Sequence, residues 1–254
     1  MPLSAAQLSE FREVGYLNLG HLFSADELTE IGAEYDRLVT LEAQTLGNPR
    51  DGVFPYRAML NFRSDTLKRF ISHPDLLAVT VQLLGDDVRF WWDQGINKLA
   101  GSGSVIPWHQ DNGYHRGRIP EYLTIWLALD DSSLANGGLE VIPGSHLEGL
   151  REHVMEDVHA TIPSEHVAAE KAVALDAAAG EVLVFSTLLV HRTVGNHTSD
   201  RQRRAWVMQY ARGDARDETT GIPCDDRPWV VRGGERVAEP WSERPFELGR
   251  HNGE

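Results

Sequence analysis

The chain has 254 residues, of which 41% are hydrophobic and 24% are charged, so it can bury the core of one or two domains. With 38 acidic against 24 basic side chains the formal net charge is -14, which disfavours nucleic acid and acidic membrane surfaces as partners. The single cysteine, Cys224, excludes an internal disulfide, and because we find neither a leader pattern nor a membrane-length apolar run, we expect a cytoplasmic protein.

The first third of the chain is predicted to be mostly helical. Helix-capping patterns at residues 4–7 and 24–27 each precede apolar residues at helical spacing, with a short strand at 16–19 between the two helices. A third helix is predicted to begin at Pro74 and to end before Gly85. We therefore expect a helical N-terminal part over about 1–86.

From residue 88 the pattern changes to short segments rich in β-branched and aromatic residues, separated by Gly, Pro, Asn and Asp. Strands are predicted near 88–99, 105–112, 121–130, 138–142, 172–175, 182–185, 188–194 and 203–212. Evenly spaced short strands with no helical pattern between them indicate an antiparallel sandwich or barrel, packed against the helices. The expected fold is mainly β, in one domain over 1–254 with its core at about 88–212.

Two segments have no clear pattern. Residues 146–171 are polar and are predicted to form a surface excursion with some helix. Residues 213–254, rich in Arg, Gly, Pro and Trp, are predicted to form an ordered but irregular tail. Because isolated tryptophans are costly to leave in water, part of this tail should pack on the barrel or on a partner subunit, which leaves a homodimer open.

The segment Pro107 to Asp111 places an imidazole and a carboxylate two residues apart. In an extended strand such residues project from the same face, so His109 and Asp111 can reach one metal ion. The facial arrangement of two histidines and one carboxylate needs a third ligand, for which His191 on a late strand is the candidate. By itself the His-x-Asp pair is weak evidence, since an ordinary hydrogen-bonded histidine is the more common case.

Arginines follow His191 before the last predicted strand, at positions 201, 203 and 204. An arginine on this strand is well placed to bind a carboxylate through two parallel hydrogen bonds. Strand alternation sends Arg203 and Arg204 to opposite faces, so only one of them can do so.

Taken together, these segments resemble the phytanoyl-CoA dioxygenase family of iron(II)- and 2-oxoglutarate-dependent oxygenases. The segments that carry the resemblance are Asn97 with Lys98, Pro107 to Asp111, Trp126 within Thr-Ile-Trp-Leu-Ala-Leu-Asp, Asn136 to Gly138, Ile142 to His146, and His191 to Arg204. The resemblance implies a double-stranded β-helix, the jelly-roll or cupin-like fold, with iron at one mouth of the barrel.

The resemblance also implies roles for individual residues. His109, Asp111 and His191 would be the catalytic metal ligands, and Lys98, Gln110, Trp126, Thr193 and one arginine would bind 2-oxoglutarate. The family's arginine precedes an alanine by two positions, which selects Arg203; the interval from His191 is one residue longer than expected, so Arg204 stays an alternative.

The implied reaction consumes O2 and 2-oxoglutarate, releases succinate and CO2, and hydroxylates an unactivated C–H bond of a small molecule. Desaturation, epimerisation and ring closure use the same ligands and stay open as outcomes. Two alternative functions also remain at this point: a cupin-like hydrolase or isomerase with zinc or manganese on the same ligands, and a non-catalytic binding protein on the same fold. The polar loop at 114–118 is a candidate specificity element. The net charge favours a neutral, zwitterionic or cationic substrate, although a local arginine can still hold an acid.

Overall fold

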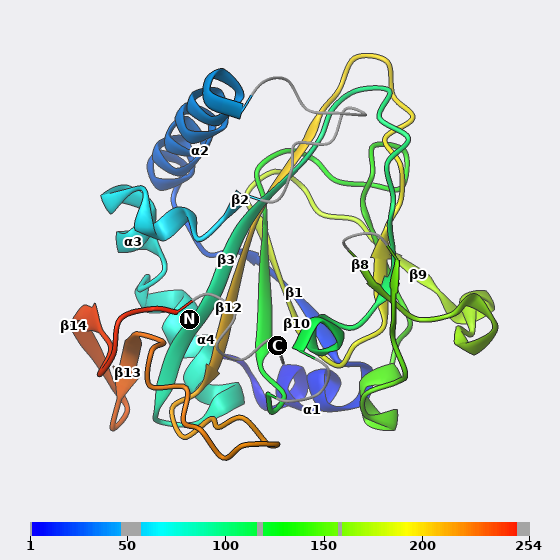
Figure 1. The fold of residues 1–254 in the computed structure, drawn as a ribbon. Coiled ribbons are helices and arrows are strands. Elements are labelled where there is room, and N and C mark those ends of the chain that lie inside the picture. Colours follow the sequence, from blue (N-terminus) through cyan, green and yellow to red (C-terminus); the bar gives the residue numbers. More distant parts are fainter. Residues whose placement is uncertain (1, 47–56, 116–118, 157–158, 248–254) are drawn as a thin grey trace.

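The computed structural model of the protein describes residues 2–46, 57–115, 119–156 and 159–247, and two antiparallel sheets dominate it (Figure 1). The large sheet has the order β1 (Tyr16–His21), β10 (Glu181–Ser186), β5 (Leu123–Ala128), β12 (Arg203–Arg212), β3 (Val88–Lys98), β13 (Trp229–Arg232) and β14 (Glu235–Trp241), and β2 (Arg57–Ala58) also pairs with β3. The small sheet has the order β4 (Ile106–His109), β11 (His191–Thr193), β6 (Leu139–Val141) and β9 (Val173–Leu175). This arrangement of two antiparallel sheets confirms the predicted mainly β, jelly-roll class, while the assignment of all residues to one domain stays a prediction.

The helices cover one face of the large sheet (Figure 1). They are α1 (Ala5–Val14), α2 (Ala25–Leu46), α3 (Asp65–Phe70) and α4 (Pro74–Leu84). The predicted capping box at Ser4 and Gln7 begins α1, and Pro74 and Gly85 bound α4 as expected. The short helix α3 was not predicted. None of the helices in these described segments is both long and apolar enough to cross a membrane.

Side-chain alternation along the strands separates two cores. On β12, Trp206 and Met208 point toward the helices, whereas Ala205 and Val207 point toward the small sheet and pack with Leu139 and other apolar residues of that sheet. The same division holds on β5 and β10, because successive residues of a strand face opposite sides. The inner face of the large sheet therefore meets the small sheet, and the functional residues lie between the two.

The excursion at 146–171 contains short 3-10 helices, η4 (Ser145–Glu148), η5 (Ser164–His166) and η6 (Ala169–Lys171), and an unpredicted hairpin of β7 (Val154–Glu156) and β8 (His159–Thr161). The hairpin is joined to the small sheet where the Ile162 N–H donates to the Trp108 carbonyl at 2.8 Å.

The C-terminal segment is regular where we expected an irregular tail. β13 and β14 form a hairpin that extends the large sheet beside β3. Arg89 of β3 lies 3.7 Å above the ring of Trp229 and pairs with Glu243 at 2.9 Å, and Trp229 donates to Glu243 at 2.8 Å. The hydrogen bond from Arg89 is the main reason that the pKa of Glu243 falls to about 2. Arg89 also donates to the carbonyl of Arg227, which lines the main cavity, so this cluster holds the C-terminal segment beside the cavity.

Candidate metal centre

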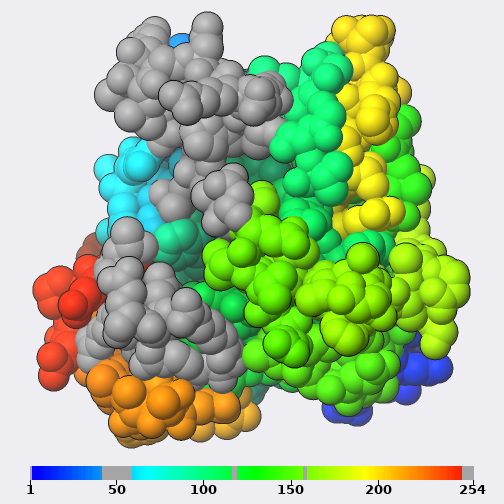
Figure 2. All heavy atoms as spheres, turned by 45° about the vertical axis from the view of Figure 1, so that its right-hand side comes forward, coloured from blue at the N-terminus to red at the C-terminus, as the bar shows by residue number. Residues whose placement is uncertain are grey.

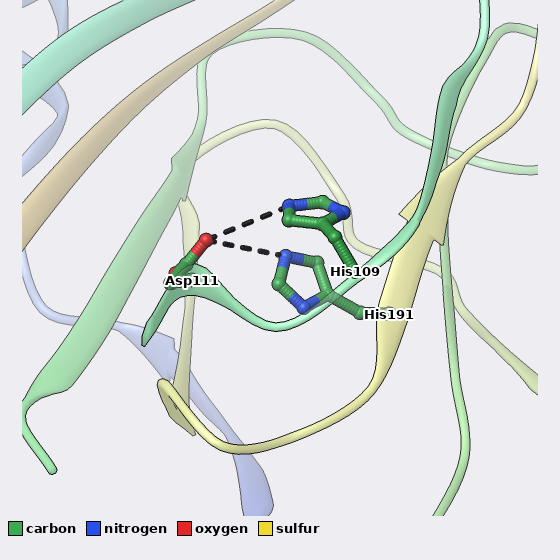
Figure 3. A group of neighbouring side chains, drawn as sticks. All are labelled: His109, Asp111 and His191. Carbon is green, nitrogen blue, oxygen red and sulfur yellow. Dashed lines mark ion pairs between the residues drawn. The ribbon is translucent and has the colours of Figure 1, made fainter. Parts of the chain in front are cut away.

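The two predicted histidine ligands meet at the end of the small sheet. His109 is the last residue of β4, His191 is the first of β11, and the antiparallel ladder pairs them with ring centroids 4.1 Å apart. Asp111 points its carboxylate at both rings (Figure 3). Its Oδ1 atom is 3.6 Å from Nε2 of His109 and 3.7 Å from Nε2 of His191.

Asp111 reaches this position by a route other than the predicted one. The strand expected over 105–112 ends at His109, and Asp111 opens the 3-10 helix η3 (Asp111–His115). The backbone N–H of Gln110 leaves the ladder to donate to Nε2 of His153, and the N–H of Gly113 donates to the Gln110 carbonyl. His109 and Asp111 therefore converge because the chain turns after β4, so the strand-alternation argument was wrong.

Each imidazole is held in one orientation by a backbone carbonyl. Nδ1 of His109 lies 2.8 Å from the Pro107 carbonyl, and Nδ1 of His191 lies 2.9 Å from the Leu189 carbonyl. Because a carbonyl only accepts, we assign the ring proton to Nδ1, which turns the Nε2 lone pair toward Asp111. Burial, and next the neighbouring His109, lower the pKa of His191 to about 4, so this imidazole is neutral at pH 7, as a metal ligand must be.

The second oxygen of Asp111 is fixed by two side chains of the large sheet. Oδ2 accepts a short hydrogen bond from the Thr124 hydroxyl and another, at 3.1 Å, from Nε2 of Gln209. Burial raises the pKa of Asp111, but the two imidazoles and Thr124 outweigh it and bring the pKa to about 2. Sequence reasoning missed Thr124 and Gln209. The only feature of the sequence that could have identified them is that they are polar residues within strands that are otherwise mostly apolar.

We expect Thr124→Val to weaken iron(II) binding by about 10- to 100-fold, the usual effect of removing an outer hydrogen bond from a metal-binding carboxylate. The change keeps the shape of the side chain and removes the hydroxyl that orients Asp111. Anaerobic titration with iron(II) measures the affinity. Thr80→Val is the matched control, because Thr80 is equally buried but its hydroxyl bonds to the Leu77 carbonyl within α4; equal affinity of the two variants would contradict the role of Thr124.

The three side chains fit a first-row metal ion. Their ligand atoms all lie within 4.8 Å of one another. Metal–nitrogen bonds of about 2.1 Å, as in zinc sites, hold two ligands of one ion within about 4.2 Å of each other, and both distances to Asp111 meet this limit. Two neutral imidazoles and one carboxylate are the ligand set of non-haem iron(II) oxygenases.

Arg203, at the start of β12, is a fully buried cation on the inner face of the large sheet. Its Nη2 donates to the Gly137 carbonyl at 2.6 Å, whereas Nε and Nη1 have no hydrogen-bond partner among the described residues. Burial lowers the pKa of Arg203 to about 10. A buried guanidinium with two unused donors is costly unless an anion binds beside it, so this position fits a carboxylate.

Trp126 and Thr193 offer further hydrogen-bond donors on the same side. Both line the main cavity, and within the described segments the indole Nε1 of Trp126 and the hydroxyl of Thr193 have no partner. The Arg203 guanidinium lies 5.5 Å from the Trp126 ring. The structure therefore brings Arg203, Trp126 and Thr193 together, as the resemblance implied.

Lys98 lies beside Arg203 but does not line the cavity. It is the register partner of Arg203 across β3 and β12, and its Nζ donates to the carbonyls of Ser104, at 3.0 Å, and Val194. Burial first, and then the charge of Arg203, lower the pKa of Lys98 to about 6. Lys98 therefore links β3 to the segments that contain Ser104 and Val194, outside the lining of the cavity.

The structure does not bring Gln110 into the pocket. Its amide nitrogen donates to the carbonyls of Gly149 and Leu188, at 2.9 and 2.6 Å, and its amide oxygen accepts from the backbone N–H of Arg151. These bonds tie the turn after β4 to the neighbouring loops, and we leave Gln110 out of the proposed 2-oxoglutarate site.

Arg204 points to the outer face. Its guanidinium pairs at 2.6 Å with both Asp36 of α2 and Asp130, and the hydrogen bonds to Asp130 are the main reason that its pKa is raised. With two carboxylates already bound, Arg204 does not compete with Arg203 for a ligand.

The main cavity has a volume of about 310 Å³, at the lower end of the range for small-molecule sites. It is lined by Trp92, Gln94, Ile96, Ile106, His109, Asp111, Tyr114, His115, Tyr122, Thr124, Trp126, Leu139, Phe185, His191, Thr193, Val207, Gln209 and Arg227. The loop suggested as a specificity element thus contributes Tyr114 and His115, while Arg116 and Arg118 lie outside the described residues.

Comparisons with known proteins agree with this geometry. A family model described as phytanoyl-CoA dioxygenase (PhyH) matches residues 11–205. The chain is similar to the ectoine dioxygenase of Sphingopyxis alaskensis, at 28% identity over 93% of this chain and 85% of that protein. It is also similar to a probable alpha-ketoglutarate-dependent hypophosphite dioxygenase of Stutzerimonas stutzeri, at 25% identity over 83% of this chain and 79% of that protein. Among solved structures, EvdO2 from Micromonospora carbonacea var. aurantiaca complexed with 2-oxoglutarate shares the fold, with a TM-score of 0.70 and 22% identity over 95% of this chain and 96% of that one.

Proposed function

The chain belongs to the phytanoyl-CoA dioxygenase family, and from this premise we propose that His109, Asp111 and His191 hold iron(II) while Arg203 holds 2-oxoglutarate. The protein is an iron(II)- and 2-oxoglutarate-dependent dioxygenase that acts on a small molecule, as its relatives named for ectoine and hypophosphite do. Hydroxylation of an unactivated C–H bond is the outcome that we propose for this chain.

One observation carries the assignment of the site: the metal-binding set and an unsatisfied buried guanidinium share one barrel interior. A hydrolase or isomerase on the same three ligands needs no anion beside Arg203, and a buried cation without a partner anion is destabilising. A dioxygenase of this family binds a dicarboxylic co-substrate, which supplies the missing anion. The complete ligand set likewise disfavours a binding protein without catalysis.

The proposed metal ligands have separate roles in the reaction. Bound iron(II) and 2-oxoglutarate together activate dioxygen, so that 2-oxoglutarate becomes succinate and CO2 and one oxygen atom enters a substrate C–H bond. His109 and His191 would hold the metal through Nε2. Asp111, kept ionised mainly by the two imidazoles and oriented by Thr124 and Gln209, would supply one negative charge.

The co-substrate would lie on the inner face of the large sheet. Arg203 pairs with its distal carboxylate, and the indole of Trp126 and the hydroxyl of Thr193 donate hydrogen bonds to its oxygens. The apolar lining, which includes Ile106, Leu139 and Phe185, keeps bulk water from this part of the cavity.

Anaerobic titration of the purified protein with iron(II) and then 2-oxoglutarate tests the proposal. Chelation of the metal by the 2-oxo acid should give a faint charge-transfer band in the visible spectrum. Glutarate is the matched control ligand, because it has the same five carbons and both carboxylates but no 2-oxo group, and it should give no band. A folded protein that binds iron(II) but shows no band with 2-oxoglutarate contradicts the proposed function.

A further inference from the structure

Arg227 lines the main cavity, and it lies at the end opposite the buried Arg203. In the pairing of β12 with β3, Arg203 lies opposite Lys98 and Gln209 lies opposite Trp92. Six residues, or about 20 Å of strand, therefore separate the pair that contains Arg203 from the pair that contains Gln209. Asp111 of the metal centre is bonded to Gln209. The guanidinium of Arg227 lies 4.4 Å from the ring of Trp91, next to Trp92, and is therefore on the far side of the metal centre from Arg203.

Arg227 is held rigidly. Its Nη1 donates to the fully buried Asp226 at 2.9 Å, and its guanidinium is 4.4 Å from the ring of Phe246 as well as from that of Trp91. Its carbonyl accepts from Arg89, at 2.7 Å, within the cluster that anchors β13. A guanidinium fixed by stacking and by a buried partner loses little conformational entropy when it binds a ligand.

The same end of the cavity is aromatic and rich in hydrogen-bond donors. Trp92 and Tyr122 form apolar walls, and Gln94 adds an amide. Burial raises the pKa of Tyr122 well above its usual value, so its hydroxyl stays protonated and can donate. Among the described lining residues, the only carboxylate is that of the proposed ligand Asp111 and the only arginine is Arg227.

The C-terminal segment that carries Arg227 lies outside the part of the chain that the family model matches, residues 11–205. Figure 2 shows this segment, orange to red, on one side of the face that also presents the excursion at 146–171, in yellow-green on the other side. The match to the family model therefore assigns no role to Arg227.

We propose that Arg227 determines specificity by binding the carboxylate of the substrate, which would be a small, largely apolar organic acid. This inference rests on the proposed dioxygenase function. Arg227 holds the acid group at the aromatic end of the cavity, and the apolar body of the acid extends along Trp92 toward the metal ligands. The cavity of about 310 Å³ has to hold 2-oxoglutarate too, which limits the substrate to a small molecule.

The test compares carboxylic acids with their own primary amides, which have nearly the same shape but no charge. The probes are a panel of monocarboxylic acids with alicyclic or aromatic bodies, added to the protein with iron(II) and 2-oxoglutarate. Equilibrium binding is measured anaerobically from the perturbation of the charge-transfer band, and turnover is measured as succinate release. We expect at least one acid to bind about 10-fold or more tightly than its amide.

The Asp226→Asn/Arg227→Gln double variant identifies the residue responsible. It replaces the buried ion pair with a neutral pair of similar size, because Arg227→Gln alone removes the cation beside the buried Asp226 carboxylate and can destabilise the fold. We expect the double variant to lose the preference for the acid and to bind acid and amide with equal affinity. Its affinity for 2-oxoglutarate should not change.

Arg232→Gln is the matched control, since Arg232 is an exposed arginine at the end of β13, five residues after Arg227, that does not line the cavity. It should keep the preference for the acid. The inference is overturned if no acid of the panel binds more tightly than its amide, or if the double variant keeps the preference. In both cases the band with 2-oxoglutarate persists, whereas failure of the proposed function removes that band from every variant and from the wild type.

Discussion

Asp111→Ala is expected to reduce iron(II) affinity more than about 100-fold and to abolish 2-oxoglutarate-dependent succinate release. Loss of a hydrogen bond to a metal ligand alone costs about 10- to 100-fold, and this change removes a ligand and the only negative charge of the set. The fold should survive, because Nε2 of Gln209 also donates to the Thr124 hydroxyl at 3.2 Å, so the two side chains stay linked without Asp111. Iron(II) titration and thermal unfolding of the apoprotein measure the two quantities.

Asp214→Ala is the control for this change. Asp214 is an exposed aspartate that pairs with the exposed Arg212 and does not line the cavity, so its loss should affect neither iron binding nor activity. Wild-type iron affinity in Asp111→Ala would exclude Asp111 as a metal ligand, and a collapsed fold would be visible in the unfolding experiment.

Arg203→Met is expected to raise the KM for 2-oxoglutarate by about 100-fold or more while iron(II) binding is kept. A buried hydrogen bond to a charged group contributes about 1.5–3 kcal/mol, and a guanidinium can offer two of them to one carboxylate. 2-Oxoglutarate at about 100 times its Kd should stabilise the wild type by about 2.7 kcal/mol, or roughly 5–10 °C in Tm. The variant should show no such shift at the same concentration.

Arg204→Met is the matched control one residue away. It removes the pairs with Asp36 and Asp130 on the outer face and should lower the Tm without changing the KM for 2-oxoglutarate. The reverse result, with Arg204 controlling the KM, would assign the co-substrate to the other face. Unchanged activity in Arg203→Met would instead favour a metal hydrolase or isomerase on the same three ligands.

The sequence was sufficient for the architecture because strand periodicity is a local property. All eight predicted core strands are present, and α1 and α4 begin where predicted, after the N-cap Ser4 and at Pro74. The C-terminal hairpin was missed because β13 and β14 depend on long-range contacts, such as that between Arg89 and Glu243, 154 residues apart.

The sequence also identified the three side chains that converge at the candidate metal centre, although it gave a wrong reason for the position of Asp111. A short spacing such as that of His109 and Asp111 keeps two ligands close whichever local structure the chain adopts. Only the tertiary structure showed that the strand stops at His109. It stops there because the backbone N–H of Gln110 donates to His153, which is 43 residues away in the sequence.

The orientation of the remaining site residues was decided by tertiary packing alone. Alternation separated Arg203 from Arg204 but could not say which one faces inward; Asp36, 168 residues away, draws Arg204 to the outer face. In the same way, Gln110 is drawn out of the pocket by carbonyls of distant loops, and Arg227 is brought into it from the tail. Periodicity and spacing determine which residues form strands and which ligands are neighbours, whereas the direction of a polar side chain depends on partners that only the folded chain brings within hydrogen-bonding distance.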